Sequence, residues 1–238
     1  MSGATEANLD LGLRVNVDST RMILDILRRV KPGIRVIYSS ACAVFGPSDG
    51  QVVTEMTMPV PGSSYGAQKL ICETLLNDFS RRGLIDGRIL RLPTIIVRPG
   101  APSGAASSFF SGIIREPLKG KKSQLPVARS LEVWVCSTRT IVRNLILARD
   151  IPEERFGCAS RVVNLPGITV TVEQMLQALK GVGGEKVLSL VEEKKDPAVE
   201  DIVLSWPTRF DTTRAKELGF IGDGSLERTI QEYLKDYT

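Results

Sequence analysis

Residues 35–69 constrain the fold most, because they join a strand of buried character to a helix that carries a tyrosine and a lysine. The apolar run that begins at Arg35 ends in two hydroxyl side chains, Ser39 and Ser40. Such a run is typical of a buried parallel strand, and open α/β sheets bind their ligands at the carboxyl ends of these strands. We therefore expect an α/β fold with a site at the end of this strand.

Tyr65 and Lys69 lie four residues apart in a segment of helical periodicity, so both side chains stand on one helix face. A free phenol has a pKa of about 10 and is a poor base at neutral pH, but a neighbouring ammonium lowers that pKa. We expect Tyr65 to take a proton from a substrate alcohol, Lys69 to lower the pKa of Tyr65, and Ser40 to orient the alcohol. Hydride transfer then requires a cofactor, because no side chain carries hydride.

Composition excludes several classes of function. The chain has 238 residues, of which 42% are hydrophobic and 24% charged, as in an ordinary globular protein. It contains no histidine, so we expect no Ser-His-Asp triad and no metal site. The net charge of +4 comes without a long basic cluster, and no apolar run has the length of about 18–20 residues that spans a membrane, so neither nucleic acid nor membrane is an expected partner. The four cysteines are widely spaced and follow no secretory leader, which indicates reduced thiols in a cytoplasmic protein.

A Tyr-x-x-x-Lys motif is weak evidence alone, but its context is informative. The order S-S-A-C-A-V-F-G at 39–46, a polar loop, and S-Y-G-A-Q-K at 64–69 resembles the extended short-chain dehydrogenase/reductases, the NAD-dependent epimerase/dehydratase family. Residues 91–118, from R-L-P-T-I-I-V-R-P-G to I-I-R-E-P-L, resemble the D-erythronate dehydrogenase group, and residues 131–145 extend that likeness. The resemblance implies a Rossmann-like doubly wound parallel sheet, NAD as cofactor, and oxidation of a small sugar acid such as D-erythronate at C2.

The resemblance also implies roles for individual residues. N-V-D-S-T at 16–20 is similar to a family motif whose asparagine completes the catalytic set, so Asn16 is expected to order a water or backbone group near Lys69 unless it simply faces solvent. Lys69 would also hold the nicotinamide ribose. Further cofactor contacts are expected from Ser39, Tyr65, Pro93, Thr94 and Ile95, although the last three could merely end a strand.

One position departs from the family pattern. Counted back from A-V-F-G, the place that usually holds the catalytic Ser or Thr is Ala41, and Ser40 stands one residue earlier. A shift of one residue in a strand turns the side chain to the opposite face. Ser40 remains the expected donor because a local change of backbone could bring it inward, with Ser39 as the second choice.

A sugar acid needs a cation or a helix N-terminus for its carboxylate. The segment that follows the Pro-rich loop and the next helix offer both positive charge and hydroxyls. The candidates are Arg115, Arg139, Ser107 and Ser108. The alternative for each arginine is a solvated surface charge.

Hydrophobic periodicity predicts a long helix over residues 9–30 and a second over 64–82, which family resemblance suggests as the interface of a homodimer. Residues 1–8 have the composition of a loop. We expect a division into residues 1–104, half of an NAD-binding domain, and 105–238, a substrate lobe with returning elements. Further strands are expected at 87–97, 162–165 and 186–191, and helices at 171–181, 212–218 and 225–236.

A dinucleotide-binding fold opens with a strand, a Gly-rich turn on a helix N-terminus, and an acidic residue about 20 positions later. The sequence contains none of these, and residues 1–3 resemble the loop after the fourth strand of family members. We expect an N-terminally truncated sheet with one strand edge unpaired, and weak or no NAD binding by this polypeptide alone. Two alternatives stay open: a sugar-nucleotide epimerase or dehydratase, and a non-catalytic truncated paralogue.

Overall fold

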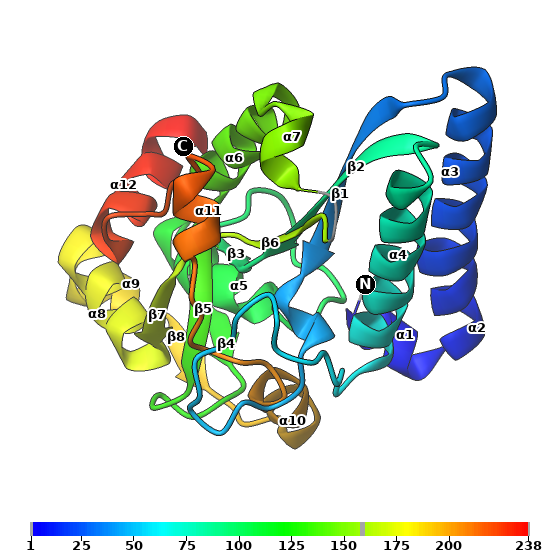
Figure 1. Cartoon of the computed structure of the whole chain (residues 1–238). Coiled ribbons are helices and arrows are strands. Elements are labelled where there is room, and N and C mark those ends of the chain that lie inside the picture. The colour runs from blue at the N-terminus through cyan, green and yellow to red at the C-terminus, as the bar shows by residue number, and fades with distance from the viewer. Residues whose placement is uncertain (1, 158–159, 238) are drawn as a thin grey trace.

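The computed structural model describes residues 2–157 and 160–237, and it has the expected α/β architecture (Figure 1). The first sheet is fully parallel and has the strand order β1-β2-β6. Its longest pairing runs from Ile34 opposite Ile85 to Ala41 opposite Leu92. The three strands are β1 (Ile34–Ala41), β2 (Ile85–Leu92) and β6 (Val162–Asn164).

A second sheet has the order β3-β5-β7, with β3 parallel and β7 antiparallel to β5. Its strands are β3 (Thr94–Ile96), β5 (Glu132–Ser137) and β7 (Ile168–Thr171), and a separate parallel pair joins β4 (Ser123–Leu125) to β8 (Val191–Glu193). The single strand expected over residues 87–97 is therefore two strands in two sheets. Pro93 separates them, because proline has no N–H to donate to the β ladder.

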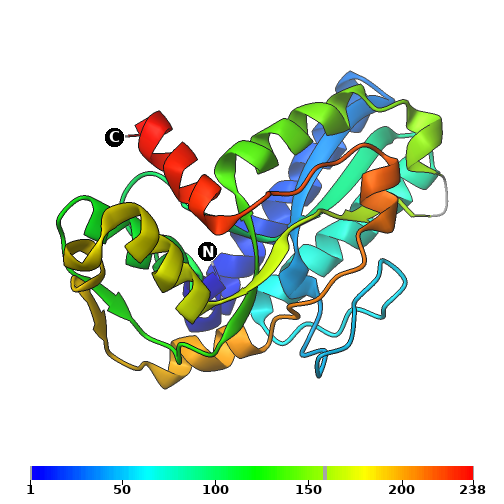
Figure 2. The same cartoon turned by 90° about the vertical axis from the view of Figure 1, so that its left-hand side faces the viewer.

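Helices cover both faces of the first sheet (Figures 1 and 2). On one side α4 (Ser64–Arg81) and α3 (Ser19–Val30) enclose a hydrophobic cluster that includes Ile89, and on the other α6 (Thr138–Asp150) packs over a cluster that includes Leu90. Consecutive residues of β2 thus serve opposite faces, as strand alternation requires. This two-sided covering explains why β2 is buried along almost its whole length, its charged residues included.

The N-terminal segment is more helical than expected. Residues 1–8 were predicted as a loop, but α1 (Ser2–Ala7) is a helix, and α2 (Leu9–Gly12) begins at the cap residue Asn8, whose side chain accepts from the Leu11 N–H. Helix α2 continues into a π-helical segment, Leu13–Asp18, and then into α3. The helix expected over residues 9–30 is present, with a widened turn that hydrophobic periodicity does not reveal.

The C-terminal part surrounds the largest hydrophobic cluster, which lies between the second sheet and the helices that pack on it. The strand expected at 186–191 is wrong: its first residues form α9 (Glu185–Leu188), whose Val187 and Leu188 pack against that cluster, and β8 follows only at Val191. The short helix α10 was not foreseen. The remaining helices are α5 (Ser108–Leu118), α7 (Glu153–Phe156), α8 (Val172–Gly183), α10 (Pro197–Leu204), α11 (Thr213–Glu217) and α12 (Leu226–Tyr237).

Among the described residues β1 pairs only with β2, so its other edge is unpaired, as the sequence predicts. Helix α3 also leaves an apolar row exposed, made of Met22, Ile23, Ile26 and Val30. Within residues 2–157 and 160–237, no helix combines the length and apolar character needed to cross a membrane. Cys42, Cys72 and Cys136 are buried free thiols, as expected, whereas Cys158 lies outside the described residues.

Candidate active site

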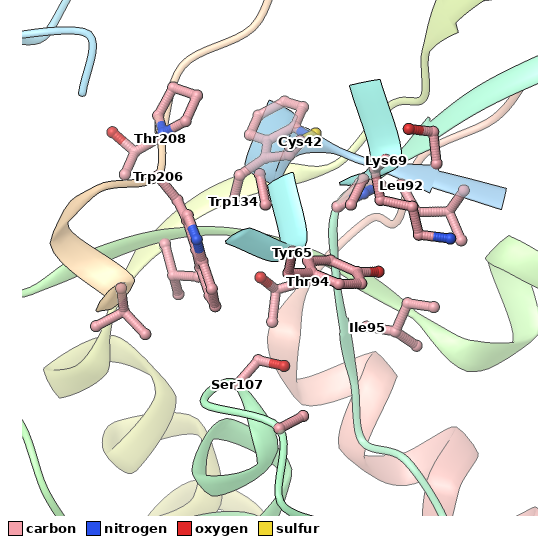
Figure 3. A pocket seen from close by; sticks show the side chains of 18 of the residues that line it. Cys42, Tyr65, Lys69, Leu92, Thr94, Ile95, Ser107, Trp134, Trp206 and Thr208 are labelled. Carbon is pink, nitrogen blue, oxygen red and sulfur yellow. The ribbon is translucent and has the colours of Figure 1, made fainter. Parts of the chain in front are cut away.

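A cavity of about 290 Å³ opens at the carboxyl ends of β1 and β2, where the sequence predicts a site (Figure 3). Figure 3 shows Tyr65 and Thr94 in the middle of its lining, with Trp206 on one side and Lys69 on the other. Segments that are far apart in the sequence therefore meet here. Residues that line the cavity include Ser39, Ser40, Ala41, Tyr65, Lys69, Pro93, Thr94, Ile95, Arg98, Ser107, Glu132, Trp134, Trp206 and Thr208.

Helix α4 places Tyr65 at the cavity because its first turn approaches the end of β1 closely. Ser63 caps the helix by accepting the Gly66 N–H at 3.2 Å. A Cβ at Gly66 would collide with the carbonyl oxygen of Ala43, so the glycine of S-Y-G permits this approach. The motif thus carries both the reactive phenol and the small residue that brings it to the strand end.

Lys69 lies one turn further along α4 and faces the same region. Its Nζ donates to the carbonyl oxygen of Ser39 at 2.9 Å and lies 5.7 Å from the centre of the Tyr65 ring. Burial lowers the pKa of Lys69. An ammonium has three donors, and Ser39 is its one acceptor among the described residues, so donors remain for a ligand.

The electrostatics of Tyr65 differ from the expectation. Burial raises the pKa of the Tyr65 phenol, and the positive charge that opposes this rise is Arg98, not Lys69. The expected lowering of the Tyr65 pKa by Lys69 is therefore not found in the ligand-free protein. The physical reason is that a largely buried phenolate loses more hydration than these cations restore.

Ser40 lines the cavity, but its hydroxyl serves another partner. The Ser40 hydroxyl donates to Glu73 Oε1 at 2.5 Å, and Glu73 forms a buried ion pair with Arg91 at 2.6 Å. Strand alternation directs Ser40 toward α4, as the one-residue shift relative to Ala41 indicates. Orientation of a substrate by Ser40 thus stays a prediction without support from the hydroxyl's position, and Ser39 and Ala41 share the other face of the strand.

Asn16 is brought to α4, but to the residue before Lys69. Its Nδ2 donates to Gln68 Oε1 at 2.7 Å, and its backbone oxygen accepts from Thr20 Oγ1 at 2.7 Å and from the Cys72 thiol. Asn16 lies inside the π-helical segment, a local feature that is frequent at functional sites. The side chain of Asn16 is half-buried and contacts α4.

The four residues expected to bind a substrate carboxylate separate into two groups. Ser107 lines the cavity, whereas Ser108 accepts the Ser103 N–H at 2.9 Å. Arg139 pairs with Asp236 at 2.6 Å, away from the cavity. Arg115 is 2% exposed and is held by the Arg98 carbonyl oxygen and by Glu116. Neither arginine lines the cavity, because long-range partners already engage both.

Several cavity residues were missed by the sequence analysis, among them Arg98, Trp134 and Trp206. Arg98 follows β3 in the R-P-G turn, and its position directly after the predicted strand was the only available signal. Trp134 and Trp206 line the cavity, and each has a buried indole N–H without a partner among the described residues. Unpartnered buried donors are rare in proteins and commonly indicate a ligand or water.

Comparison with known proteins identifies the family. Residues 3–153 match the NAD dependent epimerase/dehydratase family, and the chain belongs to it. It is 47% identical to D-erythronate dehydrogenase of Cupriavidus necator, an alignment that covers 99% of this chain and 72% of the relative. It is 43% identical to D-erythronate dehydrogenase of Haemophilus influenzae, covering 99% of this chain and 74% of the relative. The resemblance to the D-erythronate dehydrogenase group and the enzyme class it predicts, an NAD-dependent oxidoreductase, are confirmed.

Among solved structures, a nucleoside-diphosphate-sugar epimerase from Agrobacterium tumefaciens superposes with a TM-score of 0.91 at 40% identity, covering 100% of this chain and 70% of that one. L-threonine 3-dehydrogenase from Trypanosoma brucei superposes with a TM-score of 0.88 at 24% identity, a likeness of fold. The Rossmann-like fold class predicted from the sequence is thereby confirmed.

Proposed function

We propose that this protein oxidises the C2 hydroxyl of a small sugar acid, with D-erythronate as the first candidate, and that its cofactor is NAD. The observation that carries the proposal is the position of Tyr65 and Lys69 at the mouth of the cavity. Two relatives that align with nearly the whole chain and bear the name D-erythronate dehydrogenase support the choice of substrate.

NAD, when bound, would supply the acceptor for the hydride that leaves C2 of the substrate. Tyr65 takes the proton of the C2 hydroxyl, and the product is the 2-oxo acid. Lys69 has spare donors for the hydroxyls of the nicotinamide ribose, and Arg98 is the cation that opposes the rise in the Tyr65 pKa. Pro93 and the first residues of β3, Thr94 and Ile95, line the same cavity, so the residues present fit the nicotinamide end of the cofactor.

The alcohol oxygen needs a second hydrogen-bond partner besides Tyr65. Because the Ser40 hydroxyl donates to Glu73, we propose that Thr94 or Ser107, whose side chains line the cavity, supplies this partner. Ser39 remains a further candidate from the strand end. Ala41 stands where the family usually has a hydroxyl, so this chain is expected to be a slower catalyst than relatives that have one.

An assay of NADH formation tests the proposal. The full chain is mixed with millimolar NAD, because the sequence predicts weak affinity for the cofactor, and D-erythronate is compared with UDP-sugars. Oxidation of the acid and no conversion of the nucleotides is the expected result. Conversion of a UDP-sugar without oxidation of the acid would support the epimerase alternative, which the 40% identity to the Agrobacterium protein keeps in view.

We also propose a homodimer through residues 9–30 and 64–82. Exposed apolar residues on α3 and α4, among them Ile26 (52% exposed) and Ile71 (43%), support it. Sedimentation should give the mass of two chains, and Ile26→Glu should give one. Val142→Glu, at a residue of α6 exposed to a similar degree (48%), is the matched control and should leave the mass unchanged.

A further inference from the structure

The backbone of Arg98 is hydrogen-bonded at both its N–H and its carbonyl oxygen, whereas its side chain has no partner among the described residues. Its N–H donates to Ser111 Oγ at 3.1 Å, and its carbonyl oxygen accepts from Arg115 Nη1 at 2.8 Å. Ser111 and Arg115 are both buried residues of α5, so the helix holds this point of the chain on two sides. The guanidinium lines the cavity and makes no ion pair or hydrogen bond with any other residue that the structure describes.

Arginines that are buried elsewhere in the chain do have anionic partners. Arg88, Arg91 and Arg161 each pair with a carboxylate at 2.6–3.1 Å. A partly buried guanidinium without an anion loses hydration and gains nothing in return. Burial first, and the nearby charge of Arg115 second, lower the pKa of Arg98. Both effects would be relieved by a negative group in the cavity.

The cavity offers few other places for an anion. Its lining includes two positively charged side chains among the described residues, Lys69 and Arg98. The spare donors of Lys69 are assigned above to the nicotinamide ribose, which leaves Arg98 for an anion. Glu132, the acidic residue of the lining, is paired with Arg209 at 3.0 Å and so does not neutralise Arg98.

We infer that Arg98 binds the carboxylate of the substrate and thereby selects acids over neutral sugars. This inference rests on the proposed oxidation of a 2-hydroxy acid. In such an acid the carboxylate and the reacting hydroxyl are on adjacent carbons, so the group that binds the carboxylate must lie beside the base. Arg98 and Tyr65 line the same cavity, and the positive charge of Arg98 acts on the phenol. A guanidinium can donate two parallel hydrogen bonds to a carboxylate, which suits it to this role.

The chain carries its own reporter for a binding test. It contains two tryptophans, and both line the cavity, so intrinsic fluorescence reports a ligand there without turnover. D-erythronate and its uncharged amide are titrated into the protein, with and without NAD. The variants are Arg98→Gln, Arg98→Lys and, as a control of equal charge change, Arg143→Gln, which alters an exposed residue of α6.

We expect Arg98→Gln to weaken binding of D-erythronate by about 10- to 100-fold, the usual worth of a charge-assisted pair, and to leave binding of the amide unchanged. Arg98→Lys should retain part of the affinity for the acid, which also shows that the site is folded. Arg143→Gln should bind as the unaltered chain does. In turnover, Arg98→Gln should raise KM for the acid more than it lowers kcat.

The outcomes separate this inference from the proposed function. Binding of the acid that depends on Arg98, with no oxidation of any sugar acid, would refute the proposed function and retain the anion site. Oxidation of the acid with an unchanged KM in Arg98→Gln would support the proposed function and refute the assignment of Arg98 as the carboxylate site. Equal losses for acid and amide, or no fluorescence response of the unaltered chain to the acid with NAD present, would overturn the assignment of Arg98.

Discussion

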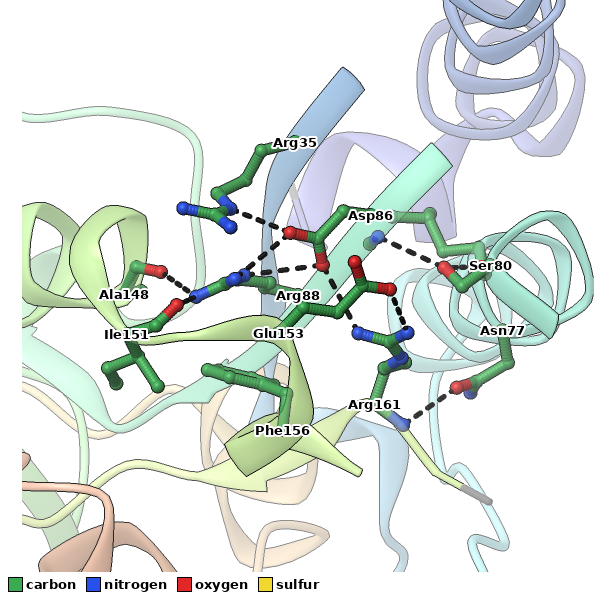
Figure 4. A network of polar contacts seen from close by, with 12 residues as sticks. Arg35, Asn77, Ser80, Asp86, Arg88, Ala148, Ile151, Glu153, Phe156 and Arg161 are labelled. Carbon is green, nitrogen blue, oxygen red and sulfur yellow. Dashed lines mark hydrogen bonds and ion pairs between the residues drawn. The ribbon is translucent and has the colours of Figure 1, made fainter. Parts of the chain in front are cut away.

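The two ends of the first sheet differ in how completely their charged side chains are paired. At the amino ends of the strands, Asp86 accepts from Arg35 at 2.7 Å, Arg88 at 2.9 Å and Arg161 at 3.1 Å (Figure 4). The guanidinium of Arg88 is fully buried and also donates to the carbonyl oxygens of Ala148 and Ile151 at the end of α6. This cluster is saturated with partners from four segments of the chain.

At the carboxyl ends of the same strands, polar groups are left incomplete. Lys69 has donors to spare, Arg98 lacks an anion, and the indole N–H groups of Trp134 and Trp206 have no partner among the described residues. A saturated cluster locks segments together, whereas an incomplete one has capacity for a ligand. The comparison predicts that substitutions in the Asp86 cluster change stability and that substitutions of cavity residues with free donors change turnover.

Tyr65→Phe should have the largest effect on turnover. Loss of the general base should lower kcat by about 100- to 10,000-fold, with an unchanged melting temperature. Tyr38→Phe is the matched control, since Tyr38 is not among the residues that line the cavity and Lys69 Nζ lies 4.6 Å from the centre of its ring. Full activity in Tyr65→Phe would remove the basis of the proposed chemistry.

Asp86→Asn should have the largest effect on stability. It leaves Arg88 buried without a carboxylate, so the free energy of unfolding should fall by about 3–5 kcal/mol in urea titrations, while KM stays the same. Asp150→Asn, which removes an exposed ion pair with Arg149, should have almost no effect. Similar losses in both variants would show that the two ends of the sheet do not differ as described.

The same cluster predicts a loss of stability in acid. Burial favours the neutral form of Asp86, but hydrogen bonds from Arg88 and Arg35 outweigh it and lower the pKa of Asp86 below 3.8. A carboxyl with a lowered folded-state pKa stabilises the fold above its unfolded pKa, and this contribution is lost as pH falls through the folded pKa. Unfolding measured below pH 4 should show this loss, and Asp86→Asn should lack it.

Ala41→Ser adds a hydroxyl at the cavity end of β1. A hydrogen bond from this hydroxyl to the reacting oxygen should raise kcat/KM by about tenfold, equivalent to about 1.4 kcal/mol. Steady-state kinetics with D-erythronate measure the change. No gain would indicate that another lining hydroxyl, such as that of Thr94, already fills this role.

Ser40→Ala should have the smallest effect, and on stability only. The hydroxyl donates to Glu73, which keeps its pair with Arg91, so the free energy of unfolding should fall by about 1–2 kcal/mol while kcat changes little. A large fall in kcat without loss of stability would restore Ser40 to the catalytic role that the sequence suggested. Thermal melting and initial rates on the same preparation distinguish the two.

Features that depend on residues close together in the chain could be predicted from the sequence. The four-residue spacing of Tyr65 and Lys69 and the apolar run of β1 depend only on helix and strand periodicity, and the glycine at 66 can be placed from the motif. Most element types follow for the same reason. The strand expected at 186–191 failed because Val187 and Leu188 are apolar enough for either state, and packing decided for a helix.

Which charged side chains have a partner could be learned only from the tertiary structure. Arg139 donates to the Asp236 carboxylate, 97 residues away, and Arg88 to the Ile151 carbonyl oxygen, 63 residues away. The Arg98 guanidinium has no such partner in the described structure. The direction of the Ser40 hydroxyl likewise depends on Glu73 lying across the helix–sheet interface. Pairing of this kind depends on distances between segments far apart in the chain, which no local spacing encodes. Arg98 could therefore be proposed only because the structure shows that Arg115 and Arg139, the arginines expected from the sequence, already have partners.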